Sequence, residues 1–307
     1  MSNPARVCVL LATHNGERYL EQQLESILNQ EGVELRVLAS DDASRDGTLE
    51  LLHTVAARDP RVTVLPQGTF GSPSGNFYRL IDEADLDWAE FIGFADQDDV
   101  WLPGKLARHA TILRDQGVDG VSSNVVAFDE HGRESLIRKD TPQRLADYVF
   151  ETPGPGSSML VSRRLMRLIR EQLQNPDSPA RKAWSHDLLF YALARAAGCS
   201  WYVDPEPTVA YRQHGENAIG ANSTLKAAAK RLELTASRWH RKLVQIVVES
   251  CIHVATPAEL PRLQWLHEVL SDVRGINRLR LARRAGEFRR TPRDRVILAA
   301  LMVTGLW

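Results

Sequence analysis

Three carboxylates stand within four residues, at Asp96, Asp98 and Asp99, and they directly follow the apolar run of residues 91–94. Such a run is typical of a buried strand. Carboxylates at this spacing repel one another, and Mg²⁺ is typically held by one or two carboxylates while a substrate phosphate and waters complete its shell. An isolated Asp-x-Asp is more often an acidic turn that ends a strand. The position after a buried strand, where open α/β sheets bind ligands, favours the metal site here.

The elements before this cluster alternate between strand and helix. Apolar runs at residues 7–12, 35–40 and 62–65 predict strands, and the first has the pattern of a central parallel strand. Helical spacing of apolar residues follows each of them. This alternation predicts a parallel sheet with helices on both sides, in which the turns after the strands share one edge. An edge of backbone turns and carboxylates suits a nucleoside diphosphate.

The chain after the cluster continues with mixed elements and then changes character. We expect these elements in order: a helix at 102–115, a strand at 118–128, a glycine-rich loop and strand at 154–161, a helix from 165, a helix at 188–197, and short strands at 201–203 and 208–211 around a Pro-Glu-Pro turn. From about residue 223 the composition changes to long helical stretches. We therefore expect a catalytic domain at 1–222 and a helical region at 223–307.

Composition narrows the classes of protein. Of the 307 residues, 43% are hydrophobic and 25% charged, which is ordinary for a soluble globular protein, and the net charge of −1 gives no field that would attract nucleic acid. Three cysteines without metal spacing suit a reducing compartment. We expect no signal peptide before the first strand, and the longest apolar run is shorter than the roughly 20 residues of a spanning helix. We expect a cytoplasmic protein, soluble or peripheral.

The C-terminal segment has an uneven charge distribution. Residues 278–295 contain eight arginines against one Glu and one Asp, and residues 296–307 are apolar. A basic stretch beside an apolar one predicts a segment that lies on an anionic membrane surface. A helix packed on the catalytic domain with a solvated basic side explains the same pattern. The sequence leaves both interpretations open.

Four motifs carry a family resemblance. They are VLLATHNGERYL (9–20), SDDASRDGT (40–48), FADQDDVW (94–101) and YRQHGEN (211–217). With them the chain resembles the inverting family 2 glycosyltransferases, and among these the bacterial polysaccharide rhamnosyltransferases. The resemblance covers residues 5–222 and implies the GT-A fold, a Rossmann-like, mostly parallel α/β sheet with flanking helices, here followed by a C-terminal helical extension.

The resemblance also implies residue roles. Nucleotide contacts fall to Thr13, Asn15, Glu17, Asp42, Asp46, Asn76 and Asp96, with Asp42 on the imide N–H of the base. Asp98, Asp96 and His214 would hold Mg²⁺ or Mn²⁺. Asp187 resembles the general base, although the family more often has Glu-Asp where this chain has His186-Asp187. Acceptor or sugar contacts fall to Trp101, Gly156, Trp184, His186 and Arg212.

The chemistry of inverting transfer agrees with these roles. One carboxylate must remove the proton of the acceptor hydroxyl, and a metal can stabilise the leaving nucleoside diphosphate. Asp187, distant in sequence, can lie across the sugar from the metal, whereas Asp99 lies beside it. Structural alternatives remain: Asp42 and Asp46 could cap the helix near residue 48, Asp187 could cap its own helix, His214 could hydrogen-bond its loop, and the tryptophans could be core residues.

The leading hypothesis is a metal-dependent inverting glycosyltransferase. Its nucleotide-sugar donor is expected to be dTDP-L-rhamnose, and its acceptor a hydroxyl of a cell-surface polysaccharide or lipid-linked glycan. Three alternatives stay open: a transferase that uses a UDP- or GDP-linked sugar, a metal-dependent nucleotidyltransferase or phosphatase, and a non-catalytic subunit that binds nucleotide sugars.

Overall fold

The computed structural model describes residues 3–213 and 238–307, which group into two compact units. The first contains Met1–Asp140, Gly154–Gln174 and Cys199–Arg212, and the second contains Thr141–Pro153, Asn175–Gly198 and Gln213–Trp307. The expected division after residue 222 falls outside the described residues and stays a prediction. The second unit also takes in two segments that precede this division.

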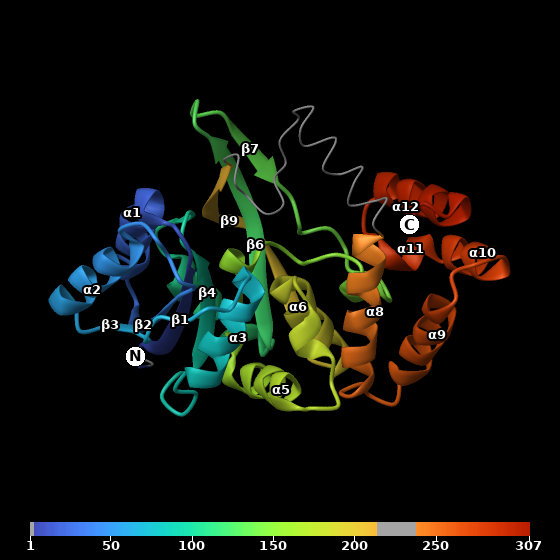
Figure 1. Ribbon diagram of the computed structural model, residues 1–307, viewed down its shortest axis with the longest axis horizontal. Helices are drawn as coiled ribbons and strands as arrows, with labels where there is room; N and C mark the ends of the chain where they lie inside the picture. Colours follow the sequence, from blue (N-terminus) through green and yellow to red (C-terminus); the bar gives the residue numbers. More distant parts are fainter. Residues whose placement is uncertain (1–2, 214–237) are drawn as a thin grey trace. The chain divides into compact units, whose positions relative to one another are not determined.

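A nine-stranded sheet in the order β3-β2-β1-β4-β8-β6-β9-β5, with β7 beside β6, forms the centre of the first unit (Figure 1). The strands are β1 (Ala5–Thr13), β2 (Val33–Asp41), β3 (Val62–Val64), β4 (Phe91–Asp96), β5 (Val100–Trp101), β6 (Gly120–Asp129), β7 (Glu134–Ile137), β8 (Leu160–Ser162) and β9 (Trp201–Gln213). The strands β1 to β4 pair in parallel, as predicted. The pairs β4–β8, β8–β6, β6–β7 and β5–β9 are antiparallel, so the sheet is mixed.

One strand differs from its prediction. The two short strands expected at 201–203 and 208–211 are a single strand, β9. Pro205 and Pro207 do not break it: β5 pairs with β9 only at Val209 and Ala210, so the prolines lie outside that ladder, and the φ of proline is compatible with extended backbone. β9 therefore runs without a break as far as the acidic turn that precedes β5.

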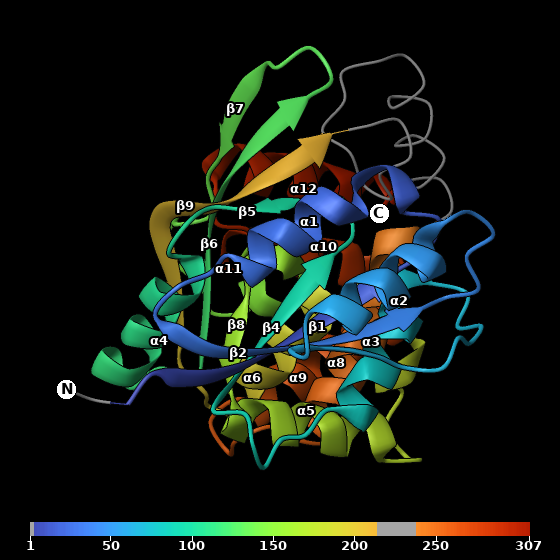
Figure 2. The ribbon, with the colours of Figure 1, turned by 90° about the vertical axis from the view of Figure 1, so that its left-hand side faces the viewer.

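Helices cover both faces of the sheet. They are α1 (Glu17–Leu28), α2 (Thr48–Arg58), α3 (Pro73–Glu83), α4 (Lys105–Gln116) and α5 (Arg163–Gln174). Figure 2 shows α1, α2 and α4 on one side and α3 and α5 on the other. α1 buries Leu20, Leu24 and Ile27, the spacing of one helix face. α1, α2 and α3 begin at the sheet edge where the acidic turns lie. α5 begins at the opposite edge, where the N–H of Arg163 donates to the carbonyl of Glu90 at 3.0 Å.

The second unit is helical. It contains the 3₁₀ helices η1 (Asp147–Val149) and η3 (Ala180–Lys182), and the α-helices α6 (His186–Ala196), α8 (Trp239–Ile252), α9 (Leu260–Ser271), α10 (Ile276–Arg283), α11 (Ala285–Phe288) and α12 (Pro292–Thr304). α8 packs against α6 and α9, and α10 packs against α12. The helices expected in the C-terminal region are confirmed. No helix within the described residues is long and apolar enough to cross a membrane.

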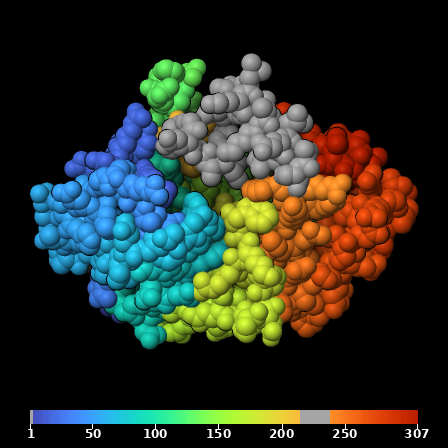
Figure 3. Space-filling model, viewed as in Figure 1, coloured from blue at the N-terminus to red at the C-terminus, as the bar shows by residue number. Residues whose placement is uncertain are grey.

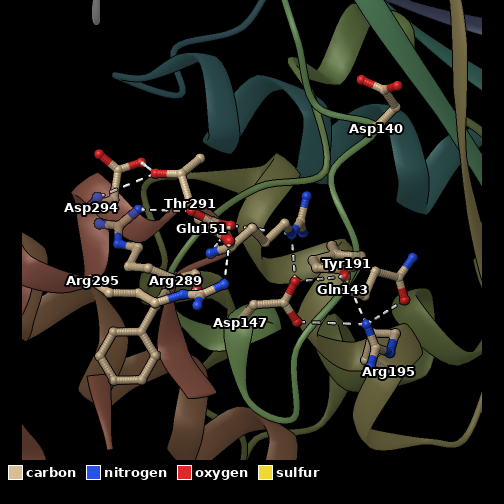
Figure 4. A network of polar contacts seen from close by, with 12 residues as sticks. Asp140, Gln143, Asp147, Glu151, Tyr191, Arg195, Arg289, Thr291, Asp294 and Arg295 are labelled. Carbon is tan, nitrogen blue, oxygen red and sulfur yellow. Dashed lines mark hydrogen bonds and ion pairs between the residues drawn. The ribbon is translucent and has the colours of Figure 1, made fainter. Parts of the chain in front are cut away.

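An ion-pair network links η1 and Glu151 to Arg289 and Arg290, which lie between α11 and α12 (Figure 4). Asp147 is fully buried, and its Oδ2 accepts a hydrogen bond of 2.5 Å from Nε of Arg290. Arg195 lies 3.6 Å from the other carboxylate oxygen. Glu151 accepts from the backbone N–H of Arg290 at 3.1 Å and pairs with Arg289 at 3.3 Å. Arg290 is thus neutralised inside the unit, so part of the basic charge of residues 278–295 has a structural role.

Candidate active site

The ends of β1 and β2 are tied together by buried polar groups. The Thr13 hydroxyl donates to Asp41 Oδ2 at 3.0 Å. Asn76 of α3 donates through Nδ2 to the carbonyls of Thr13 and Ser40 at 3.2 and 2.8 Å. Asn76 is 1% exposed. Both residues were expected to contact the nucleotide, and the structure places them beneath that edge as supports; direct contact stays a prediction.

Asp41 is a structural residue that the sequence analysis missed. It is fully buried at the end of β2. Its oxygens accept from the backbone N–H and hydroxyl of Ser44 at 2.9 and 2.5 Å, and from Gln67 Nε2 at 2.8 Å. With the hydroxyl of Thr13 this makes four donors to one carboxylate, enough to fix the turn that follows β2. The only signal for it was its place as the first of two adjacent aspartates.

Asp42 points differently from its neighbour. Its Oδ1 accepts from the backbone N–H groups of Phe70 at 2.5 Å and Gly71 at 3.2 Å, so it secures the loop before α3. It does not bond to the first turn of α2, and its alternative role as a cap of that helix is wrong. Asp42 is 7% exposed, at the edge where a base is expected.

Asp46 and Glu17 join the first two turns. Asp46 Oδ1 accepts from the Thr48 backbone at 3.1 Å, which is the capping contact considered for it, and its Oδ2 accepts from the N–H of Glu17 at 3.2 Å. Burial acts to raise the pKa of Asp46, but the hydrogen bonds from Thr48 and Glu17 hold it below its usual value. Glu17 Oε2 in turn accepts from the N–H of Gly47 at 2.9 Å. Both carboxylates are therefore already engaged in shaping the turns.

Asn15 completes the link between these turns. Its φ of 50° lies in the left-handed region, which Asn tolerates better than most residues. Its N–H donates to Ser44 Oγ at 2.8 Å, and its Oδ1 accepts from the N–H of Arg45 at 2.9 Å. Residues 13–17 and 41–48 thus form one hydrogen-bonded edge.

The acidic cluster occupies the turn between β4 and β5. Asp96 and Asp98 are partly exposed, whereas Asp99 is 1% exposed. Asp99 accepts from Ser157 Oγ at 2.5 Å and from the N–H of Arg212 at 3.2 Å. Burial, reinforced by the charges of Asp98 and Asp96, raises the pKa of Asp99 well above its usual value. Asp99 therefore supports the turn, and Asp96 and Asp98 are its more accessible carboxylates.

Arg212 holds the same turn from the end of β9. Its guanidinium lies 4.5 Å from the ring centre of Tyr19 and 4.6 Å from that of Phe128. Its Nε donates to the carbonyl of Asp98 at 2.9 Å. Arg212 was expected to contact the acceptor or sugar; that role stays a prediction beside this structural one. His214 lies outside the described residues.

Two further predicted contact residues are buried in the first unit. Gly156 lies in the 3₁₀ helix η2 (Gly156–Ser158), next to the serine that bonds to Asp99. Trp101 is 2% exposed, and Nζ of Lys105 lies 4.0 Å from its ring centre. The burial of Trp101 favours the core interpretation over stacking on a sugar.

Asp187 lies in the first turn of α6, in the second unit. Its Oδ1 accepts from the N–H of Leu188 at 2.8 Å and from the hydroxyl of Ser185. Asp187 is partly exposed. Its role as general base stays a prediction.

The neighbours of Asp187 are aromatic. His186 is buried with its ring 5.7 Å from that of Phe190, and burial lowers its pKa although the charge of Asp187 acts to raise it. The ring of Trp184 lies 5.6 Å from that of Trp239 in α8. Trp184 is partly exposed, so stacking on a sugar remains open for it, whereas His186 faces the interior of the unit.

The described residues could supply only part of the coordination shell of a divalent cation. Within residues 3–213 and 238–307, no three His, Cys, Asp or Glu side chains group as a metal site. Asp96 and Asp98 nevertheless supply two partly exposed carboxylates, the number that Mg²⁺ typically takes when phosphate oxygens and water complete its octahedron. The donor set therefore suits a metal that arrives with a diphosphate.

Comparisons with known proteins identify the family. Residues 8–170 match the sequence profile described as Glycosyl transferase family 2. The dTDP-rhamnosyl transferase RfbG of Shigella flexneri is 38% identical over 236 residues, which are 76% of this chain and 82% of that protein. An uncharacterized glycosyltransferase of Nostoc, alr2836, is 24% identical over 296 residues, 89% of this chain and 88% of its own.

Solved structures agree on the fold. TarS of S. aureus, residues 1–349 in complex with UDP, has a TM-score of 0.55 at 15% identity and covers 86% of this chain and 90% of its own. The mannosyltransferase PcManGT of Pyrobaculum calidifontis, in complex with GDP-Man and Mn²⁺, has a TM-score of 0.53 at 20% identity over 97% of this chain and 79% of its own. At such identities the likeness extends to the fold alone, and it is the predicted GT-A fold. Together with the profile match, which spans more than half of the sequence, these relatives place the chain in glycosyl transferase family 2 as a glycosyltransferase.

Proposed function

We propose that the chain is a metal-dependent inverting glycosyltransferase that transfers L-rhamnose from dTDP-L-rhamnose to a hydroxyl of a cell-surface polysaccharide or lipid-linked glycan. The observation that carries this proposal is the single hydrogen-bonded edge made by the turns after β1 and β2, together with the acidic turn after β4. The likeness to a dTDP-rhamnosyl transferase supports the choice of sugar. A cytoplasmic location follows from the nucleotide-sugar substrate.

The residues of this edge have separate roles in binding the nucleotide sugar. Asp42 faces the base, and Thr13, Asn15 and Glu17 shape the turn that receives the nucleoside. Asp96 and Asp98 would hold Mg²⁺ or Mn²⁺, which as a Lewis acid stabilises charge on the leaving diphosphate. His214 is proposed to complete that site.

Asp187 is proposed to act on the acceptor. As a carboxylate at the N-terminus of α6, it would take the proton of the acceptor hydroxyl while the hydroxyl oxygen bonds to the anomeric carbon and the nucleoside diphosphate leaves. Proton removal by a positioned base contributes about 10²–10⁴-fold. We therefore expect Asp187→Asn to lower kcat by about 100-fold or more while the affinity for the nucleotide sugar stays the same. Asp177→Asn, an exposed aspartate of the same unit, is the matched control.

A thermal-shift screen followed by a turnover assay tests the substrate. With Mg²⁺ or Mn²⁺ present, dTDP-L-rhamnose at 100 times its Kd should stabilise the protein by about 2.7 kcal/mol. UDP- and GDP-linked sugars are the competing ligands, and a larger shift with either would replace the rhamnose assignment. Rapid hydrolysis of nucleoside triphosphates without response to nucleotide sugars would instead indicate a nucleotidyltransferase or phosphatase. If Asp187→Asn kept full turnover, Asp187 would not be the general base.

A further inference from the structure

A pocket of about 290 Å³ in the second unit is lined by arginines. Arg238 and Arg241 reach it from the start of α8, and Arg274 and Arg278 from the connection after α9 and from α10. Its described lining contains one carboxylate, Asp272, which is largely exposed and lies 3.5 Å from Arg274. The pocket therefore carries an excess of positive charge.

Within the described residues, Arg241 and Arg278 have no carboxylate partner of the kind that neutralises other arginines nearby. Among the described residues, the buried Nε of Arg278 has no hydrogen-bond partner. Arg241 donates to the carbonyl of Trp307 at 3.3 Å, which is a neutral partner. Burial and the charges of Arg238 and Arg278 lower the pKa of Arg241. By contrast, Arg290 is paired with the carboxylate of Asp147. A bound anion would neutralise the arginines of this pocket in the same way.

The backbone leaves room for this arrangement. Gly305, the residue after α12, has a φ of +76° in the left-handed region that favours glycine. A Cβ at this position would collide with the guanidinium of Arg278. Gly305 therefore does two things: it ends α12 and lets Arg278 lie close against that end.

A largely apolar cavity of about 410 Å³ adjoins the arginines and shares Arg238 and Arg241 with them; its polar lining also includes His240, Arg289 and Asp294. Its apolar lining consists of Trp239, Ile297, Leu298, Leu301, Leu306 and Trp307. The surface of α12 outside the cavity exposes Val296 at 70% and Val303 at 49%, and Leu306, which lines the cavity, is itself 56% exposed. Figure 3 shows the side chains of these C-terminal helices, in orange to red, as a continuous surface. Cationic and apolar surfaces side by side fit an amphiphile with an anionic head.

We propose that this arginine pocket binds the phosphate headgroup of an anionic lipid, whose hydrocarbon chain lies in the cavity along α12. The two interpretations of residues 278–295 are thereby resolved residue by residue. Arg289 and Arg290 face carboxylates of the unit, whereas Arg278 joins arginines from outside that segment to face the lipid. The inference goes beyond the proposed function, because it concerns a second site; a lipid-linked acceptor would give that site its use.

Flotation of the full-length protein with vesicles tests the proposal. Vesicles of phosphatidylcholine with phosphatidylglycerol should bind the protein, and vesicles of phosphatidylcholine alone should bind it at least tenfold more weakly. An arginine near an anionic surface contributes about fivefold in affinity, so Arg241→Gln with Arg278→Gln should weaken binding by about 30-fold. The control, Arg58→Gln with Arg133→Gln, removes the same charge from exposed residues of the first unit and should change binding by less than threefold.

A second pair of variants tests the apolar part. Val296→Gln should weaken vesicle binding, and Leu136→Gln, an equally drastic change at a residue of β7 that is 53% exposed, should not. Circular dichroism and thermal unfolding would check that each variant is folded. Equal loss in the control variants would overturn the proposal.

Three other outcomes also overturn it. If inorganic phosphate or diphosphate raises the melting temperature only when Arg241 and Arg278 are present, yet vesicles are not bound, the pocket serves a free anion. If the protein dimerises and Val296→Gln makes it monomeric without changing flotation, a second copy covers α12. If no vesicle is bound and no anion has an effect, the pocket has no ligand of this class. Nucleotide-sugar binding in the same variants reports separately on the proposed function.

Discussion

The side chain of Gln97 exchanges two hydrogen bonds with the backbone of His14, a residue 83 positions earlier in the chain. Its Oε1 accepts from the N–H of His14 at 2.6 Å, and its Nε2 donates to the carbonyl of the same residue at 2.8 Å. Gln97 stands between Asp96 and Asp98, the two carboxylates proposed to hold the metal. The turn that receives the nucleotide and the turn that receives the metal are thus joined through one amide.

The first prediction concerns this amide. Gln97→Ala should raise the KM for the nucleotide sugar and the metal concentration needed for half-maximal rate, because the two turns lose their fixed spacing. Gly16→Ala should have a similar effect, since a Cβ on Gly16 would collide with the Gln97 side chain. Each should cost about tenfold in kcat/KM, in the range of a lost hydrogen bond or a tight contact.

A double-mutant cycle distinguishes this clamp from two unrelated defects. In Gly16→Ala with Gln97→Ala the collision is absent, so the double variant should be no worse than Gln97→Ala alone. Steady-state kinetics over a series of Mg²⁺ concentrations gives both quantities. Independent, additive losses would show that Gln97 and Gly16 do not act through one contact.

The second prediction separates two adjacent aspartates. Asp98→Asn should lower activity by about 100-fold or more and raise the metal requirement, with little change in stability, because Asp98 is partly exposed and proposed as a metal ligand. Asp99→Ala should chiefly destabilise the fold by about 2–4 kcal/mol, because it leaves the hydroxyl of Ser157 and the N–H of Arg212 without their acceptor. Activity assays and urea unfolding of both variants check this. Equal losses of stability would contradict the division of roles.

Sequence patterns predicted the parts of the site that depend on local order. The apolar runs of β1, β2 and β4 placed their turns at one edge, and the structure confirms that parallel arrangement. The antiparallel half of the sheet could not be predicted, because strand direction is set by connections that the pattern of residue types does not encode. β9 shows the same limit: Pro205 and Pro207 indicate a turn in the sequence, yet the structure keeps them within one extended strand beside β6 and β5.

Contacts between side chains that are far apart in sequence could not be predicted either. Asp41 and Asp42 are identical neighbours, yet one is a buried hub and the other fixes the loop at residues 70 and 71. Gln97 gave no signal at all, since an amide between two carboxylates looks like a spacer until its partner is known. Residue type and spacing thus predicted which turns lie at one edge of the sheet, but the direction of each side chain depends on tertiary contacts.

The third prediction concerns the ion pair of Asp147 and Arg290 in the second unit. Both side chains are almost fully buried, so Asp147→Asn would leave a guanidinium in the interior with less counter-charge. Loss of one partner of such a pair costs about 3–5 kcal/mol, and the nearby Glu151 should keep the effect near the lower value. Urea unfolding measures the change. Asp87→Asn, whose pair with Arg167 is exposed, is the control and should cost less than about 1 kcal/mol.

The last prediction is a pH dependence of stability that arises from Lys105. The side chain is 1% exposed, and burial lowers its pKa from 10.5 to about 7. Between pH 7 and pH 10.5 the unfolded chain keeps a proton that the folded protein releases. Because the unfolded state then binds more protons, the free energy of unfolding should rise with pH in this window, by at most about 1.4 kcal/mol per pH unit.

Lys105→Met should remove this dependence. The variant should be more stable than the original protein at pH 7, and the difference should shrink as the pH approaches 10, where unfolding the original protein no longer gains a proton. The neighbours do not reverse the sign: His109 is buried with its pKa well below 6.5, and Asp204 is paired with Arg108. Urea unfolding at pH 7.0, 8.5 and 9.5 measures the effect, with the exposed Lys182→Met as control. A stability difference that stays constant across these pH values would mean that Lys105 keeps its proton in the folded protein.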